Sequence, residues 1–224
     1  MAKAESLLAL LRLVSPALPI GAYAGSEGLE FAVDQDWIGS EADVCDWLGG
    51  RLRHGLSRLD IPLLKRFYRA HSEGDLEALE YWEAFLWASR ETAELADQDR
   101  SLGRALMRLL TDLGIERAEG LGGAGGPSYA SAFALAATVW EIDLETAAHG
   151  YLFSWCESQV AAAVKLVPLG QTQGQRVLGE LMEAIPAQVL IGLALQDDRI
   201  GFSEPGVAIA SASHETQYAR LFRS

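Results

Sequence analysis

The residues best suited to specific contacts gather at the end of this 224-residue chain, in residues 213–224. Apolar side chains alternate there with imidazole and guanidinium groups, in the order His214, Tyr218, Arg220, Leu221, Phe222 and Arg223. The apolar members can fill a pocket, and the arginines can donate forked hydrogen bonds to carboxylates. Because chain ends fray unless something holds them, this composition predicts a docked tail. Two interpretations stay open: a tail that docks on a partner, and a tail that packs on its own domain.

The sequence shows no local pattern of the kind that catalysis or metal binding needs. Its four histidines stand singly, without a second His or Cys three or four residues away on the same helical face. Carboxylate pairs such as Asp97 with Asp99 fit a helix surface better than an acid–base pair. There is no P-loop and no GxSxG elbow, and the GxGxxG match at Gly120, Gly122 and Gly125 follows no predicted strand. We therefore expect no enzyme, no cofactor and no metal site.

The net charge and the cysteine content further restrict the classes of protein to which this chain can belong. Thirty-one acidic residues against 18 basic ones give a formal net charge of −13, which argues against a nucleic-acid-binding surface. Cys45 and Cys156 are too widely separated to indicate a zinc ribbon or a disulfide framework, and they fit a reducing compartment. No uninterrupted apolar run reaches the roughly 18 residues of a membrane span. We expect a cytoplasmic protein that binds neither nucleic acid nor a membrane.

Apolar residues recur at helical spacing along most of the chain, and few residues are β-branched, so the sequence predicts an all-α fold. We expect a single domain over 1–224, a bundle of about ten helices with residues 213–224 as its docking tail. The predicted helices cover residues 4–14, 26–33, 40–56, 60–71, 75–86, 91–114, 128–142, 144–167 and 170–197.

Polar caps and prolines set several helix boundaries. Ser40 with Asp43 matches a capping box, and Asp60 shortly before Pro62 is typical of a helix start. Pro186 is expected to break or kink the last predicted helix, because proline lacks a backbone donor.

Glycines and prolines also mark the connections. The sequence predicts an ordered loop at 15–25, a surface loop in the glycine-rich stretch 118–127, and a turn-rich connection at 200–207. Gly103 lies inside a predicted helix, where it would permit a close approach of a second helix.

Three blocks along the chain are similar to the urease accessory protein F family, UreF, which acts in the maturation of the nickel enzyme urease. They are LPIGAYAGSEGLE at 18–30, QVAAAVKLVPLGQ at 159–171 and HETQYARLFRS at 214–224. Because the blocks follow in order within a helical chain of the right length, the chain is identified as a member of the family by this resemblance. The first block departs from the family's usual aromatic-Ser-X-Ser pattern at Ala24, so its polar contacts stay open.

The resemblance implies an all-α homodimer that is neither the nickel carrier nor the GTPase. With accessory protein D, also called H, it would recruit and modulate the GTPase accessory protein G for nickel insertion into apo-urease. Residue by residue, the resemblance implies that Tyr23, Lys165 and Arg220 engage the GTPase while the tail docks on accessory protein D. The residues alone also allow a buried Tyr23 ring with a bonded hydroxyl, and a Lys165 whose stem packs while its ammonium reaches water.

Two modes of GTPase modulation stay open. An activator would supply Arg220 or Arg223 in trans as an arginine finger. A fidelity checkpoint would instead restrain hydrolysis until urease binds.

Overall fold

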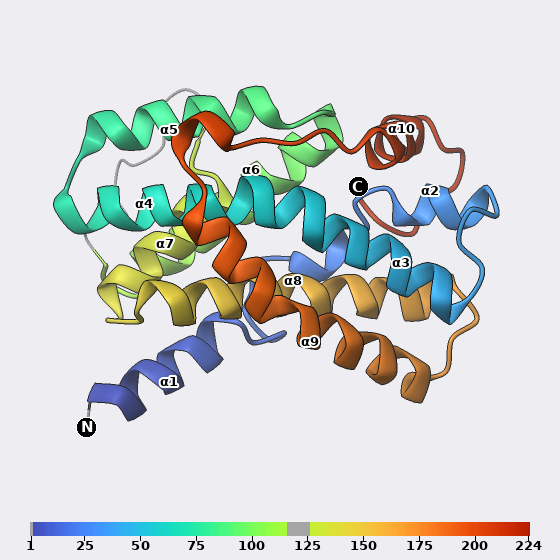
Figure 1. The fold of residues 1–224 in the computed structure, drawn as a ribbon, viewed down its shortest axis with the longest axis horizontal. Helices are drawn as coiled ribbons and strands as arrows, with labels where there is room; N and C mark the ends of the chain where they lie inside the picture. Colours follow the sequence, from blue (N-terminus) through green and yellow to red (C-terminus); the bar gives the residue numbers. More distant parts are fainter. Residues whose placement is uncertain (1, 116–125) are drawn as a thin grey trace.

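The computed structural model describes residues 2–115 and 126–224, and it confirms the all-α prediction: within these ranges every regular element is helical. Residues 118–125 of the predicted surface loop lie outside the described ranges. The α-helices are α1 (Ala2–Leu13), α2 (Leu29–Asp34), α3 (Glu41–Arg51), α4 (Ile61–Glu73), α5 (Leu76–Ser89), α6 (Ala93–Asp112), α7 (Tyr129–Val139), α8 (Leu144–Leu166), α9 (Gln171–Ala194) and α10 (Pro205–His214) (Figure 1). Short 3-10 turns occupy η1 (Ala22–Ala24) and η4 (Asp197–Arg199), and η2 (Leu52–Asp60) is π-helical.

The helices predicted over 40–56 and 60–71 correspond to α3 and α4, and Pro62 lies in the first turn of α4 as predicted. The expected separation between them is wrong, because the π-helical η2 joins α3 and α4 into one continuous helical rod. Asp60 does not cap a helix: its backbone is helical and its side chain makes no capping hydrogen bond. Its carboxylate is buried and accepts hydrogen bonds from Arg90 at 2.7 Å and from the Tyr151 hydroxyl at 3.3 Å. The Asp60 carboxylate therefore bonds residues distant in sequence, although its place before Pro62 is typical of a helix start.

Other helix boundaries follow the local chemistry. Ser40 and Asp43 form the predicted capping box, and Asp75 caps α5 by accepting the Ala78 N–H at 3.0 Å. Of the two effects expected at Pro186, a break or a kink, the break is absent, since α9 continues through this residue. The predicted loop at 200–207 is also partly wrong, since α10 begins at Pro205, a residue favoured at the first helical position.

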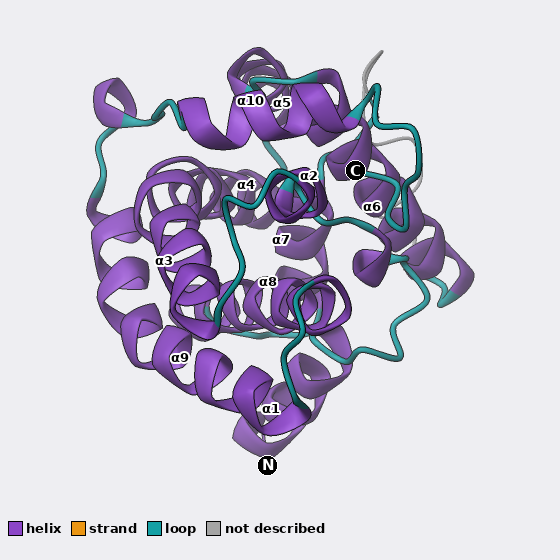
Figure 2. Ribbon diagram, turned by 90° about the vertical axis from the view of Figure 1, so that its right-hand side faces the viewer, coloured by secondary structure: helices purple, strands orange, loops and turns teal. Residues whose placement is uncertain are grey.

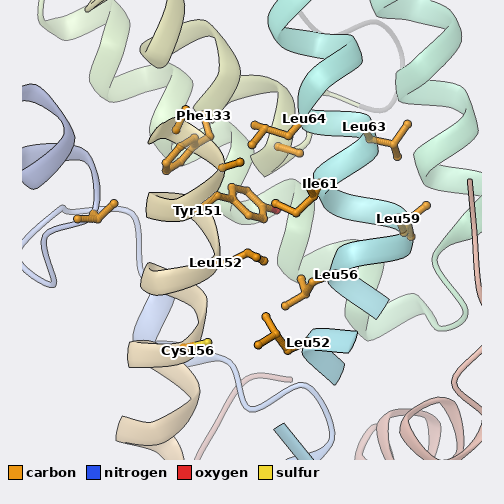
Figure 3. Packing of buried hydrophobic residues seen from close by; sticks show 14 of the residues in the cluster. Leu52, Leu56, Leu59, Ile61, Leu63, Leu64, Phe133, Tyr151, Leu152 and Cys156 are labelled. Atoms are coloured by element: carbon orange, nitrogen blue, oxygen red, sulfur yellow. The ribbon is translucent and has the colours of Figure 1, made fainter. Parts of the chain in front are cut away.

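The hydrophobic core lies where the rod crosses α7 and α8. Figure 3 shows Leu52, Leu56 and Ile61 of the rod facing Tyr151 and Leu152 of α8, and all of them are buried. Burial of a large aliphatic side chain contributes roughly 1.5–3 kcal/mol. Helix α7 is buried along most of its length, and Figure 2 places it with α8 near the middle of the bundle.

Two glycines allow segments to approach closely. A Cβ added at Gly103 of α6 would lie 2.1 Å from the carbonyl oxygen of Pro127, just before α7, which confirms the predicted close approach. Gly28, with φ +84°, starts α2 against α10, where an added Cβ would lie 2.9 Å from the Ser211 nitrogen. This left-handed backbone favours glycine, so Gly28 holds the first block against the end of the chain.

Helix α9 stands out by its apolar composition. Among the described residues it is the one helix long and apolar enough to cross a membrane by length and composition alone. In this fold it packs along α8 and α3, as a helix of a bundle does. Only 39% of its most apolar window is buried, so one apolar side of α9 faces outward.

Candidate functional site

The last residues of the chain run beside the loop that precedes α2. The Arg223 N–H donates to the Ala24 carbonyl at 2.8 Å. The Ser224 carbonyl accepts from the Ser26 N–H at 2.6 Å and from the Ser26 hydroxyl at 2.7 Å. The first and third sequence blocks, almost 200 residues apart, are therefore in direct contact near the point marked C in Figure 1.

Two carboxylates converge on His214 at the end of α10. The Nδ1 atom lies 2.8 Å from Glu94 of α6, and the Nε2 atom lies 3.1 Å from Glu30 of α2. Glu30 also accepts the backbone N–H groups of Leu221 at 2.6 Å and Phe222 at 2.9 Å. This group of Glu30, Glu94 and His214, which we call the tail clamp, fixes the tail by charge-assisted hydrogen bonds.

The tail clamp gives the tail an inner and an outer side. His214 and Phe222 are buried within this chain, so they offer no surface to a partner in this conformation. These two of the proposed partner-binding residues follow the interpretation of a tail that packs on its own domain. The other four selected tail residues are exposed and form what we call the outer tail face: Tyr218, Arg220, Leu221 and Arg223. Of these, Arg220 donates to Glu94 at 2.6 Å.

Tyr23 lies half-buried in η1, and its hydroxyl donates to Glu157 of α8 at 2.9 Å. Burial and the neighbouring Glu157 carboxylate raise the pKa of Tyr23, so the ring stays neutral. The Tyr23 hydroxyl is thus bonded within the chain, while part of its ring remains accessible.

Lys165 is exposed near the end of α8, and its ammonium lies 5.6 Å from the centre of the Phe222 ring. This distance suits a cation–π contact. Tyr23, Glu157 and Lys165 line one cleft of about 280 Å³ between α8 and α9. The structure therefore brings Tyr23 and Lys165 together, with Phe222 joining them to the tail, while Arg220 lies on the α6 side.

Behind this surface lies a buried ionic network that the sequence did not reveal. Arg51 pairs with Glu27 and Glu204, and the Trp155 Nε1–H donates to Glu27 at 3.1 Å. Burial lowers the pKa of the Arg51 guanidinium, but the two carboxylates outweigh it and raise that pKa above its ordinary value. These partners lie up to about 150 residues apart, so no local spacing could have indicated them.

A second buried pair of carboxylates shares Arg90. Its guanidinium donates to Asp60 at 2.7 Å and to Asp99 at 2.6 Å. Both networks border a pocket of about 70 Å³, which has room for very few water molecules. In each network two carboxylates share one guanidinium, and burial raises the pKa of Glu204 and of Asp99 above the ordinary carboxyl value. Because every buried carboxylate here contacts a cation, the networks fit a structural role.

The site offers no sign of nucleophilic or metal chemistry. Among the described residues, no group of three or more His, Cys, Asp or Glu side chains is arranged to hold a metal ion. Cys156 is buried, and burial raises the pKa of its thiol to about 12, so little reactive thiolate forms near neutral pH.

Comparison with known proteins identifies the relatives of this chain. A family model described as UreF matches residues 38–182. A urease accessory protein UreF from Alkalilimnicola ehrlichii is 50% identical over 215 residues, covering 96% of this chain and 94% of the relative. A protein of the same name from Teredinibacter turnerae is 47% identical over 220 residues, covering 98% of this chain and 99% of the relative.

Proposed function

The chain belongs to the UreF family of urease accessory proteins, and from this we propose that it is a non-enzymatic scaffold in urease maturation. Together with accessory protein D/H it recruits and modulates the GTPase accessory protein G, so that nickel enters apo-urease. The observation that supports this proposal most is the convergence of Tyr23, Lys165 and the tail around Phe222. We place the assembly in the cytoplasm, where both cysteines, free in this structure, stay reduced.

In this proposal accessory protein D/H docks on Tyr218 and Leu221 of the outer tail face, and Arg220 of the same face is left to the GTPase. Tyr218 is fully exposed and Leu221 is 65% exposed, and both suit pockets of a partner. Glu30 holds the backbone of Leu221 and Phe222, which supports a docking face that is formed before the partner binds. A preformed surface loses less conformational entropy on binding than a flexible one.

The GTPase meets the other side of the tail, at the cleft lined by Tyr23 and Lys165. Support comes from the exposed Lys165 ammonium, which can pair with an acidic group of the GTPase. Arg220 borders a neighbouring cleft of about 380 Å³ on the α6 side, so the GTPase would span the tail to reach all three residues.

The scaffold proposal is tested by co-purification of this chain with accessory proteins D and G. Truncation after Ser213 would remove His214 and leave Glu30 and Glu94 without their partner, so surface substitutions are cleaner. Tyr218→Ala with Leu221→Asp should abolish capture of accessory protein D. Tyr81→Ala, a comparably exposed tyrosine on α5, is the matched control and should leave capture intact. Equal capture by both variants would contradict the docking surface.

A second candidate function is a GTPase activator, and one observation favours it. Arg223 is exposed, and its guanidinium makes no hydrogen bond or ion pair with any residue that the structure describes. A free guanidinium is what an arginine finger needs. Single-turnover GTP hydrolysis in the assembled complex separates the two functions. If this chain is an activator, Arg223→Ala should abolish its acceleration of GTP hydrolysis. If it is a checkpoint, Arg223→Ala should leave the rate of GTP hydrolysis unchanged until urease is added.

The scaffold is also proposed to be a homodimer that pairs through the outward side of α9. Met182, Pro186 and Leu190 follow at intervals of four residues, and all three are exposed. Ile191 lies beside them. This spacing builds a continuous apolar stripe, and a second copy of the same helix is a self-complementary cover for it.

A further inference from the structure

The geometry around His214 places a carboxylate at each ring nitrogen. Each of its ring nitrogens lies within hydrogen-bond distance of a carboxylate, Glu94 at Nδ1 and Glu30 at Nε2. A neutral imidazole has one N–H, so it would satisfy one carboxylate and turn a lone pair toward the other, whereas an imidazolium donates to both. The ring is completely buried, so water cannot supply the missing donor.

The charges around the ring balance when it carries this second proton. It faces Glu30 from α2 and Glu94 from α6, and Arg220 of the tail binds the other oxygen of Glu94. Two carboxylates then meet one imidazolium and one guanidinium. Without the imidazolium charge, one buried carboxylate would lack a compensating cation, which is costly in a desolvated site.

The same two carboxylates hold three consecutive tail residues. Glu94 accepts from the Arg220 side chain, and Glu30 accepts from the backbone N–H groups of Leu221 and Phe222. Leu221 consequently points outward while Phe222 packs inward beneath Lys165. The direction of each tail side chain thus depends on how Glu30 and Glu94 are oriented.

We propose that His214, held as an imidazolium between Glu30 and Glu94, is a positioning residue that fixes the conformation of residues 220–223 and so forms the outer tail face. The part of this proposal that concerns binding rests on the proposed function. The part that concerns the ring and the tail backbone stands on this chain alone, so the two can fail separately.

The charge of the ring is tested by ¹⁵N NMR of the full chain labelled in histidine, near neutral pH. We expect the His214 signals of a ring protonated at both nitrogens. In Glu30→Gln an amide replaces one of the two carboxylates, so the ring should show the separated signals of a neutral tautomer. A neutral His214 ring in the unsubstituted protein would overturn the proposal.

Hydrogen exchange tests the hold on the tail. In His214→Gln, exchange of the Leu221 and Phe222 amides should accelerate by about tenfold or more, as expected when a buried charge-assisted hydrogen bond is lost. Amides of α8 should stay protected, which shows that the variant is folded. Tyr218→Ala is the control and should leave both tail amides unchanged. If His214→Gln does not fold, Glu94→Gln gives the same comparison, because its amide oxygen still accepts from Arg220.

Capture of accessory protein D by His214→Gln and Glu94→Gln tests the docking surface separately from the tail clamp. Faster tail exchange with weaker capture supports both. Faster exchange with unchanged capture supports the clamp and contradicts docking through the outer tail face. Unchanged exchange in both His214→Gln and Glu94→Gln overturns the clamp, whatever the capture shows.

Discussion

Glu83 of α5 is a single residue whose surroundings predict a dependence of stability on pH. Its carboxylate accepts the Ser128 N–H at 3.0 Å, yet burial raises its pKa to about 7, above the ordinary value of about 4.3. The folded state therefore binds this proton more tightly than the unfolded state does. The resulting stabilisation is complete below about pH 4.3 and is lost as the pH rises to about 7.

Glu83→Gln should consequently raise the free energy of unfolding by about 1–2 kcal/mol at pH 8 and change it little at pH 4, since the amide keeps an acceptor without a charge. Urea unfolding at the two pH values measures this difference. Glu80→Gln, an exposed position on the same helix, is the control and should show no such dependence. An effect of Glu83→Gln that is the same at both pH values would contradict the assignment.

For single residues, the sequence predicted which side chains matter better than it predicted where each one lies in the fold. It selected Tyr23, Lys165 and the tail, but it left open whether the tail docks on a partner or packs on its own domain, and it did not separate His214 and Phe222 from Tyr218. The inner and outer positions are decided by Glu30 and Glu94, which lie more than 100 residues before the tail. No spacing pattern within the tail contains that information.

Among the elements, the contact between α6 and α7 depends on the absence of a side chain at Gly103. Gly103→Ala would place its Cβ against the carbonyl oxygen of Pro127, and the two helices would have to separate. We expect a loss of about 1–3 kcal/mol in the free energy of unfolding, typical of overpacking. Thermal or urea unfolding measures it.

Gly50→Ala is the matched control, because Gly50 is also helical but an added Cβ would meet nothing within 4 Å. Alanine has the higher helix propensity, so this variant should gain up to about 1 kcal/mol. Similar midpoints for the two variants would show that the α6–α7 contact tolerates a methyl group.

Helix ends were predictable where the decisive groups are neighbours in sequence. Ser40 with Asp43 and Asp75 with Ala78 lie three residues apart, so local chemistry settles them. Asp60 has the same local signature, but its carboxylate bonds Arg90, 30 residues farther along. The join through η2 escaped prediction because long-range partners bind Asp60. The start of α10 at Pro205 does carry a local signal, a proline in the first helical turn, which the prediction of a connection over 200–207 passed over.

For the whole molecule, the all-α fold followed from helical periodicity, whereas the convergence of the three blocks did not. Ser26 and Ser224 bond across 198 positions of sequence. The left-handed backbone of Gly28 lets α2 pack against α10, and this contact can be recognised only in the folded chain. A resemblance in three separate blocks suggested one shared role, and the folded chain gives them a common surface.

The outward side of α9 makes a prediction about the assembled molecule. Leu190 is 72% exposed in the middle of the apolar stripe, so a carboxylate there would be buried against a second copy. Leu190→Glu should weaken a homodimer by roughly a hundredfold or more, since burying an unpaired charge at the centre of an interface is costly. Sedimentation of the full chain over a range of concentrations measures the change. Leu76→Glu on α5 starts from a similarly exposed leucine, 62%, and should leave the dimer intact. If Leu190→Glu dimerises as well as Leu76→Glu does, another face joins the two copies and the stripe on α9 is free for a different partner.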